Sequence, residues 1–233
     1  MHEVMNLPLG VIVVAGGSGQ RMGSACPKQY LQIGGCSILE LTLKTLIRLV
    51  PSAYWVVVLP AQDIEEQGEK LSSTFSPVQL NVVSGGSTRA HSVFNGLEAL
   101  PPTVERVLVH DAVRPLISDA LMSRLLTASG PSVLPVVPCV DSLRLLNTPG
   151  SIPVDRSSYV AVQTPQVFDA KLLRDAFNKI PESGRFAYTD DASLVQAVMG
   201  VSPTLVEGDP DNIKITTPKD MAIAQCLLQS IKE

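Results

Sequence analysis

Two basic residues, Arg21 and Lys28, accompany a glycine-rich segment near the amino terminus, Ala-Gly-Gly-Ser-Gly-Gln-Arg-Met-Gly over 15–23. The apolar run Val-Ile-Val-Val over 11–14 precedes it and predicts a buried strand. A strand that leads into glycines lets backbone N–H groups approach a phosphate closely. Two fixed cations beside such a cradle would stabilise the charge that develops in phosphate chemistry, so the segment indicates nucleotidyl transfer.

Two other glycine-rich motifs fit this segment less well. A dinucleotide-binding fingerprint needs a third glycine where Met22 stands and a helix directly after it, which Pro27 interrupts. A P-loop needs Gly-Lys-Ser or Gly-Lys-Thr, and Lys28 instead lies between Pro27 and Gln29. The pattern therefore favours a cradle for a nucleoside triphosphate.

A second glycine turn, Gly85-Gly86, opens a segment with helical periodicity that carries Arg89 and Ser92. The turn amides and the Ser92 hydroxyl would read the edge of a nucleobase, where donors and acceptors discriminate better than charge. The alternative is an ordinary strand-to-helix turn with a capped helix, which is a common connection. The sequence leaves both interpretations open.

Asp111 and Arg114 follow the strand-like run 106–110. At the end of a strand, Asp111 would hold ribose hydroxyls or a metal-bound water, and Arg114 would brace the loop; the alternative is a structural salt bridge. His91 and His110 stand apart from other ligand types in the sequence. We therefore interpret both histidines as packing or hydrogen-bonding residues rather than catalysts.

Elements of alternating type must position these loops. Helical segments separate the strand-like runs, which lie at 11–15, 54–59, 79–84, 106–110 and 132–138. This alternation predicts an α/β fold with a mostly parallel, doubly wound, Rossmann-like sheet, as a single domain over 1–233. Because ligands bind at the carboxyl ends of such strands, we expect the loops at 15–21, 85–92 and 111–114 to meet.

Residues 138–160 interrupt this rhythm with two extended stretches around a turn at 147–150. The pattern predicts a protruding β-hairpin arm that is too small to bury a core of its own. Such an arm needs a support. A partner subunit would supply it, so we expect a homodimer.

Composition disfavours several other classes of protein. The 233 residues carry 18 basic and 22 acidic side chains, a net charge of −4, which disfavours non-specific binding to nucleic acid. The four cysteines are scattered without a Cys-x-x-Cys pair, so neither a zinc site nor a disulfide framework is expected. We expect no secretory signal, and no apolar run approaches the roughly 18 residues of a membrane span. We expect a soluble, cytoplasmic protein without a membrane or nucleic-acid partner.

The sequence contains no Gly-x-Ser-x-Gly elbow and no His-Glu-x-x-His helix. A phosphate nucleophile needs no general base, because its second pKa is about 6 and it is largely dianionic at neutral pH. The reaction needs in-line positioning and charge stabilisation at the α-phosphorus, which lysine, arginine and Mg²⁺ supply. We therefore expect Mg²⁺ as the cofactor, held mainly by the nucleotide phosphates, with Asp111 as the candidate protein ligand.

Taken in this order and spacing, the motifs resemble the 2-C-methyl-D-erythritol 4-phosphate cytidylyltransferases of the non-mevalonate isoprenoid pathway. The resemblance spans nearly the whole chain. Its motifs are the loop 15–30, Gly85-Gly86 with Arg89 and Ser92-Val93, His110-Asp111-Ala112 with Arg114-Pro115, Asp141-Ser142, Val154-Asp155-Arg156, Gln163-Thr164-Pro165-Gln166, Thr189-Asp190-Asp191-Ala192-Ser193, and Glu207-Gly208 with Asp211-Asn212-Ile213-Lys214.

The resemblance implies the transfer of CMP from CTP to 2-C-methyl-D-erythritol 4-phosphate, with release of pyrophosphate. It implies four catalytic residues: Arg21 and Lys28 at the transition state, and Arg156 and Lys214 at the methylerythritol phosphate. The implied substrate contacts are Ala15, Gly16, Gly17, Gly19, Gly86, Arg89, Ser92, Asp111, Arg114, Asp141, Ser142, Thr164 and Thr189. It also implies a homodimer whose 138–160 hairpin reaches across, so that Asp141 and Arg156 would serve the neighbouring site.

Two departures from the family pattern are mild. Gly16 stands where alanine is frequent, and Ser142 stands where threonine is frequent, which removes a methyl group beside the substrate. The nearest alternative is a ribitol-5-phosphate cytidylyltransferase, which shares the glycine-rich loop and an ending like 211–214. A non-catalytic nucleotide-sensing subunit is a second alternative, and the presence of both Arg21 and Lys28 disfavours it. From the residues alone, CTP and UTP both stay open.

Overall fold

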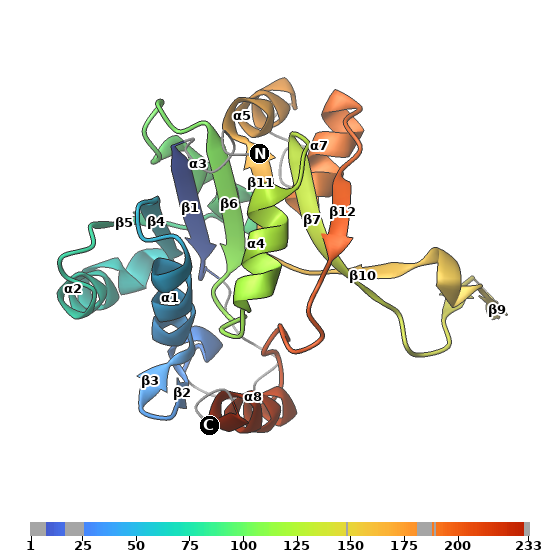
Figure 1. The fold of residues 1–233 in the computed structure, drawn as a ribbon, viewed down its shortest axis with the longest axis horizontal. Helices are drawn as coiled ribbons and strands as arrows, with labels where there is room; N and C mark the ends of the chain where they lie inside the picture. The colour runs from blue at the N-terminus through green and yellow to red at the C-terminus, as the bar shows by residue number, and fades with distance from the viewer. Residues whose placement is uncertain (1–7, 17–25, 148, 181–187, 189, 231–233) are drawn as a thin grey trace.

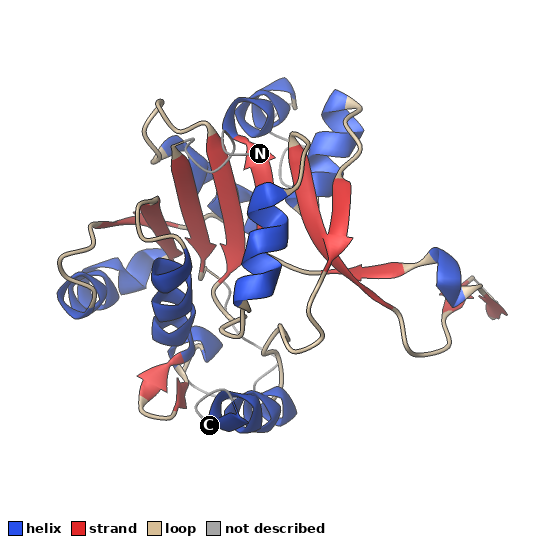
Figure 2. Ribbon diagram, in the orientation of Figure 1, coloured by secondary structure: helices blue, strands red, loops and turns tan. Residues whose placement is uncertain are grey.

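The computed structural model describes residues 8–16, 26–147, 149–180, 188 and 190–230. A mostly parallel sheet runs through the centre of the molecule (Figures 1 and 2). Its strands are, in spatial order, β10 (Val160–Val162), β7 (Ser132–Pro138), β11 (Gln166–Asp169), β6 (Arg106–Asp111), β1 (Leu9–Val14), β4 (Tyr54–Leu59) and β5 (Leu80–Ser84), while β12 (Thr204–Glu207) pairs with β7. The predicted α/β fold is confirmed.

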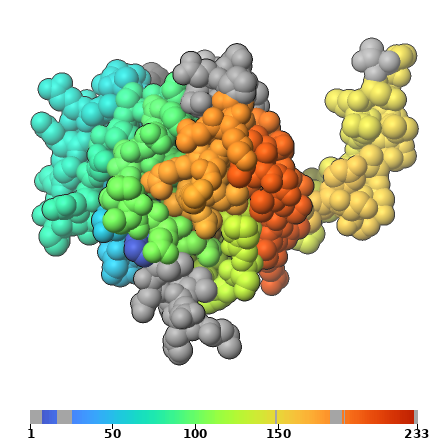
Figure 3. Space-filling model, turned by 90° about the horizontal axis from the view of Figure 1, so that it is seen from above, coloured from blue at the N-terminus to red at the C-terminus, as the bar shows by residue number. Residues whose placement is uncertain are grey.

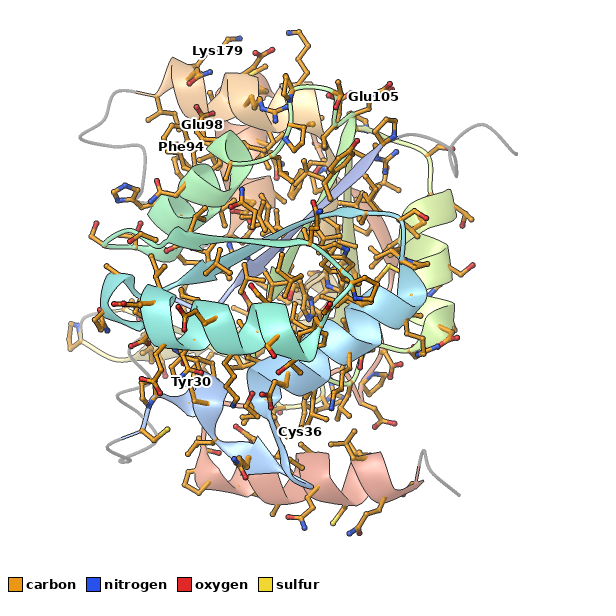
Figure 4. The ribbon with its side chains drawn as sticks, turned by 90° about the vertical axis from the view of Figure 1, so that its left-hand side faces the viewer. Tyr30, Cys36, Phe94, Glu98, Glu105 and Lys179 are labelled. Atoms are coloured by element: carbon orange, nitrogen blue, oxygen red, sulfur yellow. The ribbon has the colours of Figure 1, made fainter. Side chains whose placement is uncertain are left out.

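Helices cover both faces of this sheet, as the alternating sequence pattern predicted. On one face lie α1 (Ile38–Leu49), α2 (Ile64–Thr74) and α4 (Asp119–Thr127), and on the other lie α3 (Arg89–Glu98), α5 (Ala170–Lys179) and α7 (Asp191–Met199). The strands serve both layers because successive side chains point to opposite faces: Val11 and Val13 pack with the first group of helices, and Ile12 packs with the second. The helices α3 and α5 also meet through Phe94, labelled in Figure 4, whose ring centroid lies 5.5 Å from that of Phe177.

The last helix, α8 (Pro218–Ser230), packs apart from these two layers. It lies beside the small hairpin of β2 (Gln32–Ile33) and β3 (Cys36–Ser37), at the lower end of the view in Figure 1. A separate apolar cluster joins the two, and it includes Ile33, Ile215 and Ala224. This packing fixes the chain just before α8, where Lys214 is found.

Strand order contains one element that the sequence pattern did not predict. The short strand β11 lies between β6 and β7 and runs antiparallel to both. The parallel pairs are β1 with β4, β1 with β6, β4 with β5, and β7 with β12. With four residues, β11 is too short for a sequence pattern to identify, and its neighbours in the sheet are distant in the sequence.

The register of the central strands decides which loops meet. Val14, the last residue of β1, pairs with Val58 of β4 on one side and with Asp111 of β6 on the other. The backbone N–H of Ala15 then donates to the carbonyl of Val58 at 2.8 Å. The glycine-rich loop therefore starts directly beside Asp111, at the carboxyl edge of the sheet.

The hairpin predicted at 138–160 projects from the body of the molecule as an arm (Figures 1 and 3). Its base is the antiparallel pair β7 and β10, and farther out are the pair β8 (Arg144–Leu146) and β9 (Ser151–Pro153) and the 3-10 turn η5 (Arg156–Ser158). Its exposed apolar side chains are Val140, Leu145, Leu146, Ile152, Tyr159 and Val160. Leu146 keeps 82% of its surface exposed, so the arm buries little of its apolar area within this chain.

None of the described helices is both long and apolar enough to cross a lipid bilayer.

Candidate active site

A pocket of about 380 Å³ opens at the carboxyl ends of β1 and β6. Lys28, Arg89 and Lys214 supply three cations to its lining, and Asp111 supplies one carboxylate. A larger hollow of about 680 Å³ lies near the opposite ends of β4 and β5, and no charged side chain lines it. Only the first of these two sites offers an anionic ligand the positive charge it needs.

The first glycine loop reaches the pocket through Ala15 and Gly16. Lys28 lies on the same pocket, at the start of the 3-10 turn η3 (Lys28–Tyr30). The next residue, Gln29, is 1% exposed, and its Nε2 donates to the carbonyl of Ala15 at 2.9 Å. This hydrogen bond ties the turn that carries Lys28 to the end of β1. Gln29 belongs to the glycine-rich motif over 15–30, but nothing in the sequence indicates this positioning role.

The same turn is also fixed from its outer side. Tyr30, labelled in Figure 4, donates from its hydroxyl to Oδ2 of Asp63 at 2.8 Å. Burial, together with this carboxylate, raises the pKa of Tyr30, so the phenol stays protonated and keeps donating at any physiological pH. Lys28 is therefore held between an inner bond from Gln29 and an outer bond from Tyr30.

The second glycine turn is shaped around Ser92. The backbone N–H of Gly86 donates to Oγ of Ser92 at 3.1 Å, and that hydroxyl donates to the carbonyl of Thr88 at 3.0 Å. Thr88 caps α3 by accepting from the backbone N–H of His91 at 3.1 Å. A Cβ on Gly86 would clash with the side chain of His91, so this close approach requires glycine. The turn is thus the capped helix start that one interpretation of the sequence predicted, and it also lines the pocket.

Three cations converge on the carboxylate of Asp111. Arg89 Nε lies 3.0 Å from Oδ1, Lys214 Nζ lies 2.8 Å from Oδ2, and Arg114 Nε lies 3.8 Å from Oδ2. Burial alone would raise the pKa of Asp111, but Arg89, Lys214 and Arg114 outweigh it and hold this pKa well below its ordinary value. Asp111 is therefore a permanent carboxylate and has no capacity to act as a general base at neutral pH.

Behind this carboxylate lies the fully buried His110. Oγ1 of Thr164 accepts from the backbone N–H of Asp111 at 3.1 Å and lies 3.0 Å from Nδ1 of His110. The ring Nε2 lies 2.9 Å from the carbonyl of Arg114, which only accepts, so Nε2 carries the proton and Thr164 donates to Nδ1. Burial lowers the pKa of His110 to about 4, so the ring is neutral at pH 7. It is a hydrogen-bonding residue, as expected from the sequence.

The loop that carries Lys214 is held by side chains that bond to its backbone. Gln163 donates from Nε2 to the carbonyl of Asp209 at 2.8 Å and accepts from the Asp209 N–H at 3.1 Å. Asn212, fully buried, donates from Nδ2 to the carbonyl of Thr164 at 2.8 Å. Arg114 Nη1 donates to the carbonyl of Asn212 at 2.8 Å. Lys214 therefore meets Asp111 because Gln163, Asn212 and Arg114 fix the loop.

The other predicted site residues fall into two groups. Asp141, Ser142 and Arg156 lie on or near the arm and do not line this pocket, and Arg156 donates to the carbonyl of Val140. Four more predictions lie outside the described residues: Gly17, Gly19, Arg21 and Thr189.

Among the described residues, no group of three or more His, Cys, Asp or Glu side chains is placed to hold a metal ion. Asp111 is the one carboxylate in the described lining of the pocket. A single permanently ionised carboxylate suits Mg²⁺, which prefers oxygen ligands and commonly keeps substrate phosphates and waters as its other ligands.

The sheet topology and this cationic pocket are suited to a nucleotidyltransferase. A family model described as 2-C-methyl-D-erythritol 4-phosphate cytidylyltransferase matches residues 9–230. Enzymes of that name from Bacteroides fragilis and Bacteroides thetaiotaomicron are each 43% identical to the chain, over 93% and 94% of its length and 98% of theirs. The crystal structure of 4-diphosphocytidyl-2C-methyl-D-erythritol synthase from Anaerococcus prevotii superposes with a TM-score of 0.81 at 30% identity, covering 96% of this chain and 99% of that one.

The chain belongs to the 2-C-methyl-D-erythritol 4-phosphate cytidylyltransferase family. It is an enzyme of cytidylyl transfer, and its activity is the family's step in isoprenoid synthesis. The resemblance seen in the sequence is confirmed. The ribitol-phosphate and nucleotide-sensing alternatives are not favoured.

Proposed function

We propose that the 380 Å³ pocket binds CTP and that CMP is transferred to 2-C-methyl-D-erythritol 4-phosphate at its mouth, beside Lys28 and Lys214. The observation that carries this assignment is the convergence of Arg89, Lys214 and Arg114 on Asp111. The cluster has more positive than negative charge, so it attracts the phosphates of both substrates. Gly86 and Ser92 border the part of the pocket suited to the cytosine base, and Asp111 the part suited to the ribose.

The residues around the pocket match a reaction that needs no general base. Asp111 stays ionised, and the pKa of His110 lies near 4 with both ring nitrogens engaged, so neither group takes up a proton during turnover. The acceptor phosphate is already largely dianionic at pH 7. Arg21 and Lys28 would stabilise the charge that accumulates as pyrophosphate leaves, and Lys214 and Arg156 would hold the attacking phosphate in line.

Mg²⁺ is the proposed cofactor. When bound, it neutralises the triphosphate charge so that an anionic nucleophile can approach. Asp111 is the residue that would hold it, together with the CTP phosphates. Both oxygens of Asp111 face cations in the nucleotide-free structure, Arg89 Nε at 3.0 Å and Lys214 Nζ at 2.8 Å, so Mg²⁺ would have to share or displace one of these ion pairs.

The arm supports the proposal that the enzyme is a homodimer. A single chain leaves apolar side chains of the arm such as Val140, Leu146 and Ile152 exposed. An isolated two-stranded hairpin is marginally stable in water, so these side chains need a surface to pack on. A second copy would provide that surface and would receive Asp141, Ser142 and Arg156 into its own site.

Mixing two inactive variants tests this arrangement. If Arg156 acts in the neighbouring site, Arg21→Ala and Arg156→Ala chains restore activity when they exchange subunits. Random exchange gives about half mixed dimers, each with one intact site, so activity recovers to about one quarter of wild type. The matched control mixes Arg21→Ala with Lys28→Ala, which lie on the same loop and leave no site intact. Exchanged subunits that stay inactive in the first mixture would show that Arg156 does not serve a neighbour.

A further inference from the structure

Arg89 is held by two carboxylates from different parts of the fold. Its Nε lies 3.0 Å from Oδ1 of Asp111, and its Nη1 lies 2.8 Å from Oδ2 of Asp191. Arg89 begins α3, whereas Asp111 ends β6 and Asp191 begins α7. The guanidinium is therefore fixed from two directions beside the nucleotide pocket.

The burial of Asp191 is not explained by helix capping. The cap of α7 is Asp190, which accepts from the backbone N–H of Ser193 at 2.9 Å and from its hydroxyl at 2.8 Å. The next side chain, Asp191, is only 1% exposed, and it faces Arg89. Removing a carboxylate from water costs several kcal/mol unless it is well paired. Burial accordingly raises the pKa of Asp191, and the charge of Arg89 opposes this shift.

We infer that Asp191 is a positioning residue of the nucleotide pocket, which acts by holding Arg89 in place. The inference rests on the proposed function, in which Arg89 and Asp111 border the CTP subsite. Two carboxylates share the charge of Arg89, so Oδ2 of Asp111 stays available to Lys214. Without Asp191, Arg89 keeps only its ion pair with Asp111 and can adopt rotamers that leave the pocket. Its charge, no longer shared with Asp191, would also compete with Lys214 for the Asp111 carboxylate.

The expected effect is on nucleotide affinity. Asp191→Asn removes the charge from the side chain that holds Arg89. Because a hydrogen bond to a charged group is stronger than one between neutral groups, we expect the dissociation constant and the KM for CTP to rise about 10-fold. The value of kcat should change less, because Lys28 and its supports are untouched. Asp190→Ala is the matched control on the neighbouring residue: it removes the helix cap and lowers the melting temperature, but leaves CTP affinity within about twofold.

A double-mutant cycle distinguishes positioning from a general loss of structure. CTP affinity is measured by calorimetry for wild type, Arg89→Met, Asp191→Asn and the double variant, which lacks both buried charges and avoids an unpaired one. If Asp191 acts through Arg89, the double variant binds CTP as Arg89→Met does. A further loss in the double variant, or wild-type affinity in Asp191→Asn, overturns the inference. Wild-type affinity in Arg89→Met would instead overturn the proposed CTP subsite.

Discussion

Asp111→Asn is the substitution whose effect the structure predicts most directly. The amide has nearly the same shape as the carboxylate, so the change removes charge while leaving packing intact. Asp111 is 6% exposed, and the cations of Arg89, Lys214 and Arg114 would then face one another with the compensating carboxylate gone. Breaking a buried pair in this way costs about 3–5 kcal/mol.

The structure places the cost at the lower end of that range. Lys214 keeps 37% of its side-chain surface exposed, so it can turn toward water when its partner is lost, whereas Arg89 retains Asp191. We therefore expect a loss of about 3 kcal/mol. For a chain of this size, that corresponds to a fall in melting temperature of about 6–12 °C.

The pH dependence of this loss has a defined sign. The folded-state pKa of Asp111 lies below its unfolded value, so its stabilising contribution is present above the unfolded pKa of about 3.9. The contribution falls as the pH drops below that value, toward the folded pKa. The difference in stability between wild type and Asp111→Asn should stay constant from pH 5 to pH 8 and shrink below about pH 4.

Thermal and urea unfolding without nucleotide measure this effect. Asp119→Asn is the control, because Asp119 pairs with Arg48 at 2.7 Å on the surface, where the side chains are 73% and 57% exposed. Such pairs contribute about 0–1 kcal/mol. A melting temperature for Asp111→Asn no lower than that of Asp119→Asn would contradict this prediction, because it would mean that the carboxylate does not hold the three cations together.

Three further predictions concern catalysis, pH and metal. Lys28→Ala should lower kcat by about 10²–10³ with a much smaller fall in CTP affinity, and steady-state kinetics that show only a raised KM would contradict a role at the transition state. The pKa of His110 falls from 6.5 in the unfolded chain to about 4 in the folded protein. Between pH 6.5 and pH 4 the unfolded chain therefore binds a proton that the folded protein does not, and the free energy of unfolding decreases as the pH falls through this range. Urea unfolding should show this loss at up to about 1.4 kcal/mol per pH unit in wild type, and an equal slope in His110→Asn would rule out His110 as its source. Chelation of Mg²⁺ should abolish turnover but leave the melting temperature of the nucleotide-free enzyme nearly unchanged, and a large shift in that temperature would indicate a structural metal.

The apolar runs and glycine turns of the sequence were enough to predict most of the sheet. β4 and β6 follow continuous apolar segments, which read as buried parallel strands whatever surrounds them. Ser37 and Glu40 form a capping box at the start of α1, and such a cap depends only on residues three positions apart in the sequence. Apolar runs and helix caps depend on residues that are close in the sequence, so they can be recognised without the tertiary structure.

The antiparallel strand β11 was not predicted, because its place between β6 and β7 depends on pairing with residues distant in the sequence. The function of Thr164 shows the same limit. The resemblance implied that Thr164 contacts the substrate, and only the fold shows that its hydroxyl also bonds to His110 and to the backbone of Asp111. Which partner a hydroxyl has depends on which strands are neighbours.

The class of chemistry can be inferred from local sequence, since cations placed after strands and beside glycines indicate phosphate transfer wherever the strands lie. The pairing of those cations with carboxylates depends on how the chain folds. Asp111 meets Lys214 because buried side chains fix the loop before α8, and Arg89 meets Asp191 across 102 residues because α3 and α7 cover the same face of the sheet. Ion pairs between distant segments follow from the packing of helices and strands, and no local pattern of residues encodes them.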